Sequence, residues 1–267
     1  MLVSKVSAIL VALLIVSFGI YGSEASSLTA EELGLSIAVK AKQLDRGWGD
    51  SQADMTMILR NQNGQESRRV MRTSNLEVQD GGDKSLVIFD EPRDVQGTAF
   101  LNHSHPVGPD DQWLYLPALR RVRRISSQNA SGPFMGSEFS YEDMASFEVE
   151  KYTYKYLRDE TLNGHDCTVS EYYPVDRYSG YTRQIVWLDK TMHQPIQIEF
   201  YDRRNSLLKT LTVKDYQQYE NKYWRPAYME MTNHTNGKST VLLIENYRFG
   251  TGMTEQDFSQ AALTRIR

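Results

Sequence analysis

Hydrophobic positions near the N-terminus recur with the period of an α-helix. Apolar side chains three to four residues apart would share one face, and these are Leu33, Ile37, Ala41 and Leu44. The spacing predicts an amphipathic helix over residues 29–46, ended by Gly47 and Gly49. Thr29 precedes Glu32 by three residues, which is the form of a capping box and supports a helix start at this point.

The pattern then changes to a period of two. Apolar and polar residues alternate over 55–60, the polar run 61–65 forms a turn, and residues 69–73 complete a predicted β-hairpin. Asn163-Gly164 and Asn236-Gly237 are further turn signals. Strand-like runs rich in β-branched and aromatic residues cover 182–188, 195–201, 207–216, 224–232 and 240–249. Sequential hairpins predict an antiparallel meander, so the expected class is mainly β (α+β).

Only short helical segments are expected beyond the first helix. Residues 254–264 have Thr254 as a cap and place Phe258, Ala261 and Ala262 on one face. A short helical turn is also plausible within 137–145. No helical pattern of crossover length lies between the strands, which argues against a parallel sheet.

The first residues have the form of a secretory signal peptide. Lys5 precedes an apolar run over 6–20, and Ser23-Glu24-Ala25 places small residues where a signal peptidase reads. The run is shorter than the roughly 20 residues of a membrane-spanning helix, so an uncleaved anchor is the weaker alternative. We therefore expect residues 1–25 to be removed, and 26–267 to form a single domain with no stable membrane span.

Composition and charge exclude some classes of protein. The formal net charge of −4 argues against a nucleic-acid partner, because such proteins carry a basic surface. The single cysteine, Cys167, cannot form a disulfide within the chain. Stability must therefore come from the core.

A dense signature lies between residues 87 and 143. It combines the run 113–117, with sequence WLYLP, an arginine cluster, and the segment 132–143, with sequence GPFMGSEFSYED. In these features, and in the upstream runs 89–92 and 97–101, the chain resembles the outer-membrane lipoprotein-sorting protein family, whose members include LolA-like carriers, LolB and the regulator RseB.

The resemblance implies a fold and a role. The implied fold is a curved antiparallel sheet that forms an incomplete β-barrel, covered by the N-terminal helix and short helical lid segments. The implied role is a periplasmic, non-catalytic carrier or acceptor of lipid or lipoprotein acyl chains in a Gram-negative bacterium. One alternative is an RseB-like sensor or adaptor that binds a membrane-protein partner. A related alternative is a partner of an inner-membrane RND-type exporter. A soluble enzyme is the weakest alternative.

The aromatic part of the signature supplies the candidate cargo-binding residues. Strand alternation would place Trp113, Tyr115 and Pro117 on one side and Leu114 and Leu116 on the other. Either face could line a cavity or pack as ordinary core. In the glycine-punctuated segment, large apolar side chains favour cargo contact over plain loop packing. The candidates are Trp113, Tyr115, Leu116, Phe134, Met135 and Phe139.

Four arginines within five residues form a second candidate site: Arg120, Arg121, Arg123 and Arg124. They are either solvated charges on an exposed hairpin or a contact for lipid phosphates or an acidic partner, for which the forked guanidinium is suited.

No combination of residues indicates catalysis or a resident cofactor. His103, His105, Asp110 and Asp111 include acceptable metal ligands, but their spacing matches no known metal motif, and Pro106, Gly108 and Pro109 indicate a solvated loop. The acids Glu142 and Asp143 are better explained by a helix terminus or an ion pair than by acid–base chemistry. We expect no enzyme activity, metal or cofactor.

Overall fold

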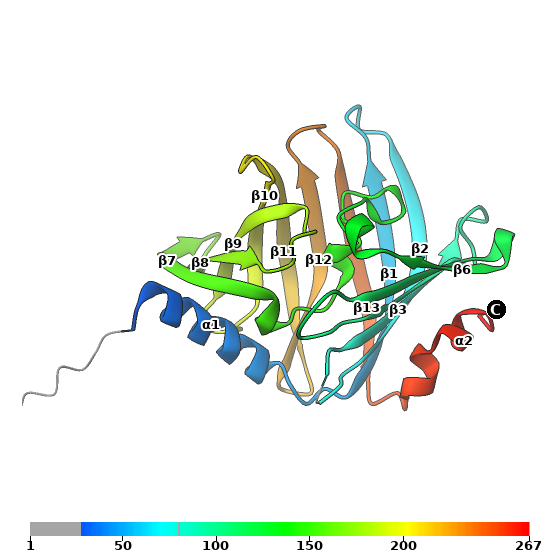
Figure 1. Cartoon of the computed structure of the whole chain (residues 1–267), viewed down its shortest axis with the longest axis horizontal. Helices are drawn as coiled ribbons and strands as arrows, with labels where there is room; N and C mark the ends of the chain where they lie inside the picture. The colour runs from blue at the N-terminus through cyan, green and yellow to red at the C-terminus, as the bar shows by residue number, and fades with distance from the viewer. Residues whose placement is uncertain (1–27, 80, 267) are drawn as a thin grey trace, which may run out of the picture.

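The computed structural model describes residues 28–79 and 81–266, and the expected signal peptide lies outside them. In these residues the chain forms one curved, fully antiparallel sheet of 13 strands in the order β6-β5-β4-β3-β2-β1-β13-β12-β11-β10-β9-β8-β7 (Figure 1). The sheet does not close, because β6 and β7 are its two edges. The expected mainly β, incomplete-barrel architecture is confirmed.

The strands of the first half of the chain are β1 (Asp50–Arg60), β2 (Glu66–Leu76), β3 (Lys84–Glu91), β4 (Ala99–His103), β5 (Asp111–Leu116) and β6 (Arg121–Ile125). Those of the second half are β7 (Tyr152–Leu162), β8 (His165–Pro174), β9 (Tyr181–Asp189), β10 (Pro195–Asp202), β11 (Leu207–Tyr219), β12 (Tyr223–Asn233) and β13 (Ser239–Phe249). The predicted hairpin is β1–β2, and the five predicted later strands are β9 to β13. Pro117 lies outside β5, in a 3-10 turn, so the predicted strand is one residue too long.

The order of the strands determines how the concave face is covered. All paired neighbours are consecutive in the sequence except β1 and β13, which meet at a seam in the middle of the sheet. Because β6 and β7 are consecutive but occupy opposite edges, residues 126–151, here called the crossing segment, must pass from one edge to the other. In Figure 1 this green segment runs across the front of the sheet.

Helix α1 (Ala30–Leu44) begins at the predicted capping box, with the Glu32 amide donating to the Thr29 hydroxyl. It packs on the concave face of the β7 side of the sheet, where Ala38 contacts Tyr154 and Tyr172. Gly34 and Ala38 are its buried residues, whereas Leu44 is exposed. A Cβ on Gly34 would lie 2.8 Å from the backbone nitrogen of Tyr156, so a small residue is required for this approach.

The C-terminal segment covers part of the opposite, convex face. It consists of the 3-10 helix η6 (Glu255–Phe258) and the short helix α2 (Gln260–Leu263). Ser259 adopts an extended conformation between them, so the predicted continuous helix is broken. This break buries Phe258 and Leu263 and leaves Ala261 exposed, in contrast to the predicted face.

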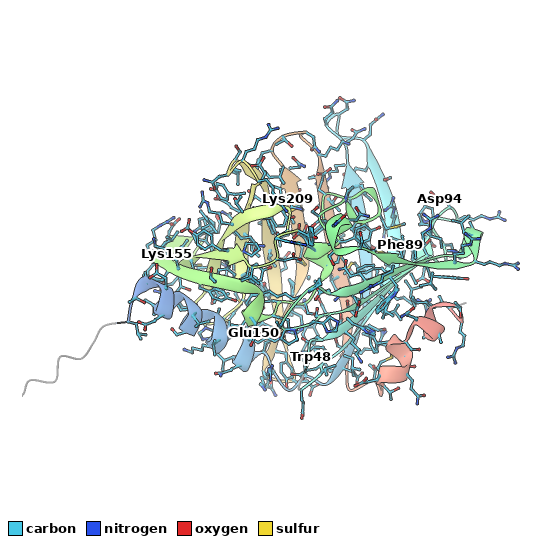
Figure 2. The ribbon with its side chains drawn as sticks, in the orientation of Figure 1. Trp48, Phe89, Asp94, Glu150, Lys155 and Lys209 are labelled. Atoms are coloured by element: carbon cyan, nitrogen blue, oxygen red, sulfur yellow. The ribbon has the colours of Figure 1, made fainter. Side chains whose placement is uncertain are left out.

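The main core lies between the concave face of the sheet and the crossing segment. Three phenylalanines are fully buried there: Phe89, Phe100 and Phe134. The ring centroids of Phe100 and Phe134 are 5.2 Å apart, and Phe89 is labelled in Figure 2. Phe134 and Phe139 are contributed by the crossing segment. The crossing segment therefore forms part of the core, and one stretch of it leaves space above the sheet.

Candidate functional site

A cavity of about 620 Å³ lies between the sheet and the crossing segment. Its floor is apolar and comes from three adjacent strands, β10, β11 and β12: Ile198, Phe200, Leu211, Met229 and Met231. Phe139, Ala145 and Phe147 of the crossing segment form the opposite wall, and the loops 108–110 and 174–179 form the rim. This volume is within the range of about 300–1,000 Å³ that is typical of small-molecule sites.

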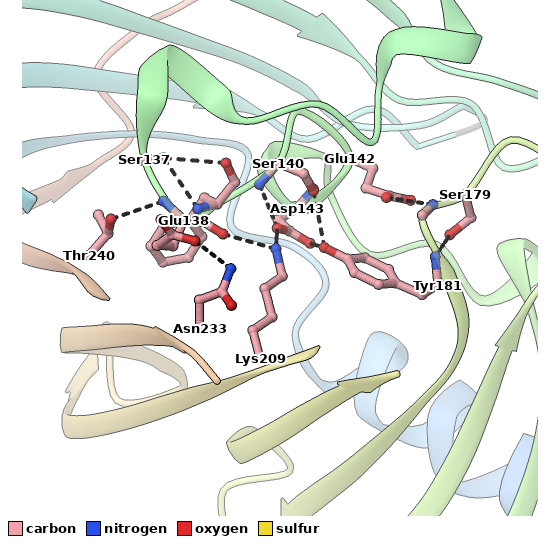
Figure 3. A network of polar contacts seen from close by, with 12 residues as sticks. Ser137, Glu138, Ser140, Glu142, Asp143, Ser179, Tyr181, Lys209, Asn233 and Thr240 are labelled. Atoms are coloured by element: carbon pink, nitrogen blue, oxygen red, sulfur yellow. Dashed lines mark hydrogen bonds and ion pairs between the residues drawn. The ribbon is translucent and has the colours of Figure 1, made fainter. Parts of the chain in front are cut away.

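A buried ion pair fixes the crossing segment above the floor. Lys209 on β11 donates to Asp143 Oδ2 at 2.6 Å and to the Glu138 carbonyl at 2.9 Å (Figure 3). Tyr181 donates its hydroxyl to Asp143 Oδ1 at 2.8 Å, and the Ser140 amide donates to Oδ2 at 2.6 Å. Asp143 is thus satisfied on both oxygens, as burial of a charge requires.

Glu142 occupies a less polar position in the same wall. Its carboxylate accepts a hydrogen bond from the Gly180 amide at 2.9 Å, linking the crossing segment to the β8–β9 loop. Burial raises the pKa of Glu142 to about 7, and the adjacent charge of Asp143 adds to this rise. The side chain is therefore partly protonated near neutral pH.

A second ion-pair cluster anchors the other end of the crossing segment. Lys42 of α1 lies 3.1 Å from Asp83 and 3.2 Å from Glu148, and it donates to the Phe147 carbonyl at 3.0 Å. Near the cavity, Lys151 pairs with Asp110 at 2.5 Å. Helix α1, the loop that contains Asp83 and the loop that contains Asp110 are thus joined to the crossing segment, which bounds the cavity.

The six aromatic and apolar candidates do not lie together. Phe139 lines the cavity, and Phe134 is fully buried in the adjacent core. Met135 is half-buried with φ of 51°, and its carbonyl accepts from Arg69 at 2.6 Å. Leu116 packs against the concave core cluster.

Trp113 and Tyr115 lie on the convex face. They belong to the cluster that includes Phe258 and Leu263 of the C-terminal segment, on the side of β5 opposite Leu114. The cavity wall in the described residues therefore contains Phe139 and none of the other five candidates.

The four arginines are all exposed, and three of them lie on the edge strand β6. Arg120 follows the 3-10 turn with φ of 49°. Arg124 pairs with Asp111, and Arg121, Arg123 and Arg120 form no ion pair among the described residues. The cluster is thus a dense positive charge on a free sheet edge.

The sequence pattern did not single out the residues of the cavity floor. Ile198, Phe200, Leu211, Met229 and Met231 belong to predicted strands, but alternation alone does not tell a filled core from an empty one. The one available signal was the spacing of Met229 and Met231, which are two residues apart and so lie on the same face of a strand.

Among the described residues no cluster of His, Cys, Asp or Glu could hold a metal ion. No helix within 28–79 or 81–266 is long and apolar enough to cross a membrane.

Comparison with known proteins defines the class of the chain. A putative outer membrane lipoprotein-sorting protein domain from Vibrio parahaemolyticus is 59% identical over 88% of this chain and all of its own, with a TM-score of 0.87. A DUF1329 family protein from Desulfovibrio piger is 29% identical over the same shares, with a TM-score of 0.83. A LolA superfamily protein from Nitrosomonas europaea is 21% identical over the same shares, with a TM-score of 0.69, and this similarity concerns the fold.

The fold is thus that of the LolA-like half-barrels. A family model with the description "Uncharacterized protein" matches residues 81–265. No curated protein sequence gives a significant match. The chain belongs to the outer-membrane lipoprotein-sorting protein family, as its signature between residues 87 and 143 predicted.

Proposed function

We propose that this protein is a non-catalytic, periplasmic carrier or acceptor that holds an acyl chain of a lipid or lipoprotein in the concave cavity. The observation that supports the proposal is the apolar floor of an unfilled cavity of about 620 Å³. Soluble domains normally fill their cores to the density of organic crystals. A large apolar space between well-packed clusters is therefore a site for a ligand of the same polarity.

The energetics of carriage are favourable. Each methylene removed from water contributes about 0.8 kcal/mol, so an acyl chain of about sixteen carbons gains on the order of ten kcal/mol before ordering costs. Met229 and Met231 add flexible, polarisable side chains to the floor, which accommodate chains of different shape. The binding is thus strong enough for transport across water and needs little chemical specificity.

The contacts of the polar groups in the cavity wall support a structural role for these groups. Asp143 is paired with Lys209, Asp110 with Lys151, and Glu142 accepts from a backbone amide. Each of these groups holds the crossing segment or a rim loop in place. The proposed activity is accordingly binding and release, without covalent chemistry.

Native mass spectrometry of the protein purified without detergent from a periplasmic extract tests the proposal. We expect bound lipid or lipoprotein mass on the wild type. Met229→Trp, which fills the cavity, should remove it. Met192→Trp is the matched control, because Met192 is also half-buried but packs in a separate cluster with Val169 and Trp187.

Two outcomes would contradict the carrier function. The first is a wild type that carries no lipid but a stoichiometric protein partner, which would indicate an adaptor. The second is equal lipid loading of the Met229 and Met192 variants, which would place the ligand outside this cavity.

A further inference from the structure

Three large apolar side chains are exposed around the mouth of the cavity. Val107 is 83% exposed, Val175 58% and Phe147 37%. They come from three separate connections, which are the β4–β5 loop, the β8–β9 loop and the crossing segment. Here they are called the apolar rim.

The apolar rim is continuous with the interior of the cavity. Phe147 and Val175 contribute to the cavity wall, and Val107 immediately precedes Gly108, which also lines it. A ligand that moves from the outside to the floor therefore meets these apolar side chains, and the charged groups of Asp110, Lys151 and Arg177 also line its path. An apolar mouth that opens onto water alone would be unfavourable, because such exposed groups normally mark a surface that becomes covered.

The polar neighbours of the rim have the composition of a membrane–water interface. Arg177 and Tyr178 directly follow Val175 and Asp176 in the β8–β9 loop. Arg203 donates to the Arg177 backbone carbonyl at 2.7 Å, so a second guanidinium group contacts the β8–β9 loop. Tyrosine and arginine next to exposed apolar residues are typical of the headgroup level of a bilayer, where anionic lipids attract the positive charge.

We propose that the apolar rim docks directly on a lipid bilayer, so that an acyl chain passes between the bilayer and the cavity without crossing water. This inference rests on the proposed carrier function and adds the surface on which loading or release occurs. A bilayer explains the rim better than a protein partner does. Three isolated side chains from separate loops form no continuous groove, but they can each insert to a shallow depth.

Flotation with vesicles of phosphatidylethanolamine and phosphatidylglycerol tests docking. The wild type should float with the vesicles. The variant Val107→Ser, Phe147→Ser, Val175→Ser should partition less by on the order of tenfold, because it removes the inserting side chains. The matched control changes Leu35, Leu119 and Leu207 to Ser, since these are also exposed, at 45%, 52% and 37%, and do not line the cavity.

A second variant distinguishes loss of docking from loss of the fold. Phe147 stacks on Tyr152 with ring centroids 6.0 Å apart, so its removal could disturb the crossing segment. Val107→Ser with Val175→Ser leaves this stack intact and should still reduce flotation. Reduced flotation of both rim variants, with the control equal to wild type, supports docking through the rim.

The outcomes for docking and for carriage are distinguishable. Binding of a fluorescent fatty acid without vesicles reports on the cavity, and flotation reports on the rim. A wild type that binds the probe but does not float, or rim variants that float as well as the wild type, would overturn docking and leave carriage standing. A wild type that binds no probe would overturn the proposed function itself.

Discussion

Lys209 Nζ lies 2.6 Å from Asp143 Oδ2, and the two side chains are 5% and 6% exposed. This contact joins strand β11 of the floor to the crossing segment above it. The pair also holds the hydroxyl of Tyr181 and the amide of Ser140 through Asp143. This buried charge pair is therefore one of the contacts that set the position of the crossing segment and, with it, the height of the cavity.

Lys209→Met should lower the free energy of unfolding by about 3–5 kcal/mol, because it leaves the carboxylate of Asp143 buried without a counter-charge. Urea denaturation measures the loss. The control is Lys190→Met, which breaks the solvent-accessible pairs with Asp159 and Asp166 and should cost about 1 kcal/mol. Equal losses for the two variants would contradict the role of the buried pair.

Glu142 should make the protein less stable as the pH rises from about 5 to 8. Its pKa is raised to about 7 from 4.5, so the folded state binds more protons than the unfolded state between these values. Stability then falls with increasing pH, and each unit of pKa shift corresponds to about 1.4 kcal/mol.

The melting temperature across this pH range provides the measurement. Glu142→Gln keeps the shape of the side chain and removes the ionisation, so its melting temperature should change less with pH than that of the wild type. A wild type and variant with parallel pH profiles would exclude Glu142 as the cause.

Gly34→Ala should destabilise the protein although alanine favours helices. Alanine in place of glycine stabilises an exposed helix by about 1 kcal/mol, but overpacking costs about 1–3 kcal/mol. The new Cβ would lie 2.8 Å from the backbone nitrogen of Tyr156, which cannot move aside alone. Thermal unfolding compares it with Ser36→Ala on the exposed side of α1, which should be neutral or stabilising. A stabilised Gly34→Ala would show that α1 can shift away from β7.

Replacement of Arg120, Arg121, Arg123 and Arg124 by Gln should leave the circular dichroism spectrum unchanged. Only Arg124 forms an ion pair among the described residues, and exposed pairs contribute little. Association with anionic vesicles or an acidic partner should fall, more strongly at low salt because screening is weaker there. Unchanged association at both salt concentrations would show that the cluster is only solvated charge on an edge strand. Such charge discourages unwanted strand pairing.

The mature protein should begin near Ser26. This prediction rests on the apolar run over 6–20 and the small residues before position 26. Sequencing of the N-terminus of the protein in the periplasmic fraction measures it. Intact Met1 on membrane-bound protein would instead indicate an anchored form.

Local sequence patterns accounted for much of the fold. The capping box located the start of α1 at Thr29, two-residue alternation located the β1–β2 hairpin, and runs rich in β-branched and aromatic residues located the five strands from β9 to β13. The convex placement of Trp113 was not predictable, because β5 is apolar on both faces and the partner that covers it, around Phe258, is distant in the sequence. Likewise, the burial of Leu263 depends on the break at Ser259.

The cavity was harder to predict than the sheet. Its floor combines strands that alternation identifies, but its existence depends on where the crossing segment leaves space, and that is set by tertiary contacts. Lys209 shows the difficulty well. A lysine in a strand that also contains Lys214 and Asp215 is expected to be solvated, and only its approach to Asp143 explains its burial.

The seam between β1 and β13 has a consequence for how the chain folds. Each half of the sheet, β1 to β6 and β7 to β13, consists of hairpins between consecutive strands, which form early because they close short loops. The seam pairs Met55 with Ile244, which are separated by most of the chain. Bringing these strands together has a large loop-closure entropy cost, so the seam should form after both meanders exist. Since the crossing segment packs on strands from both halves, the cavity cannot take shape until the seam has formed. Binding competence should therefore appear in the last, slowest step of folding, when the chain already has most of its secondary structure.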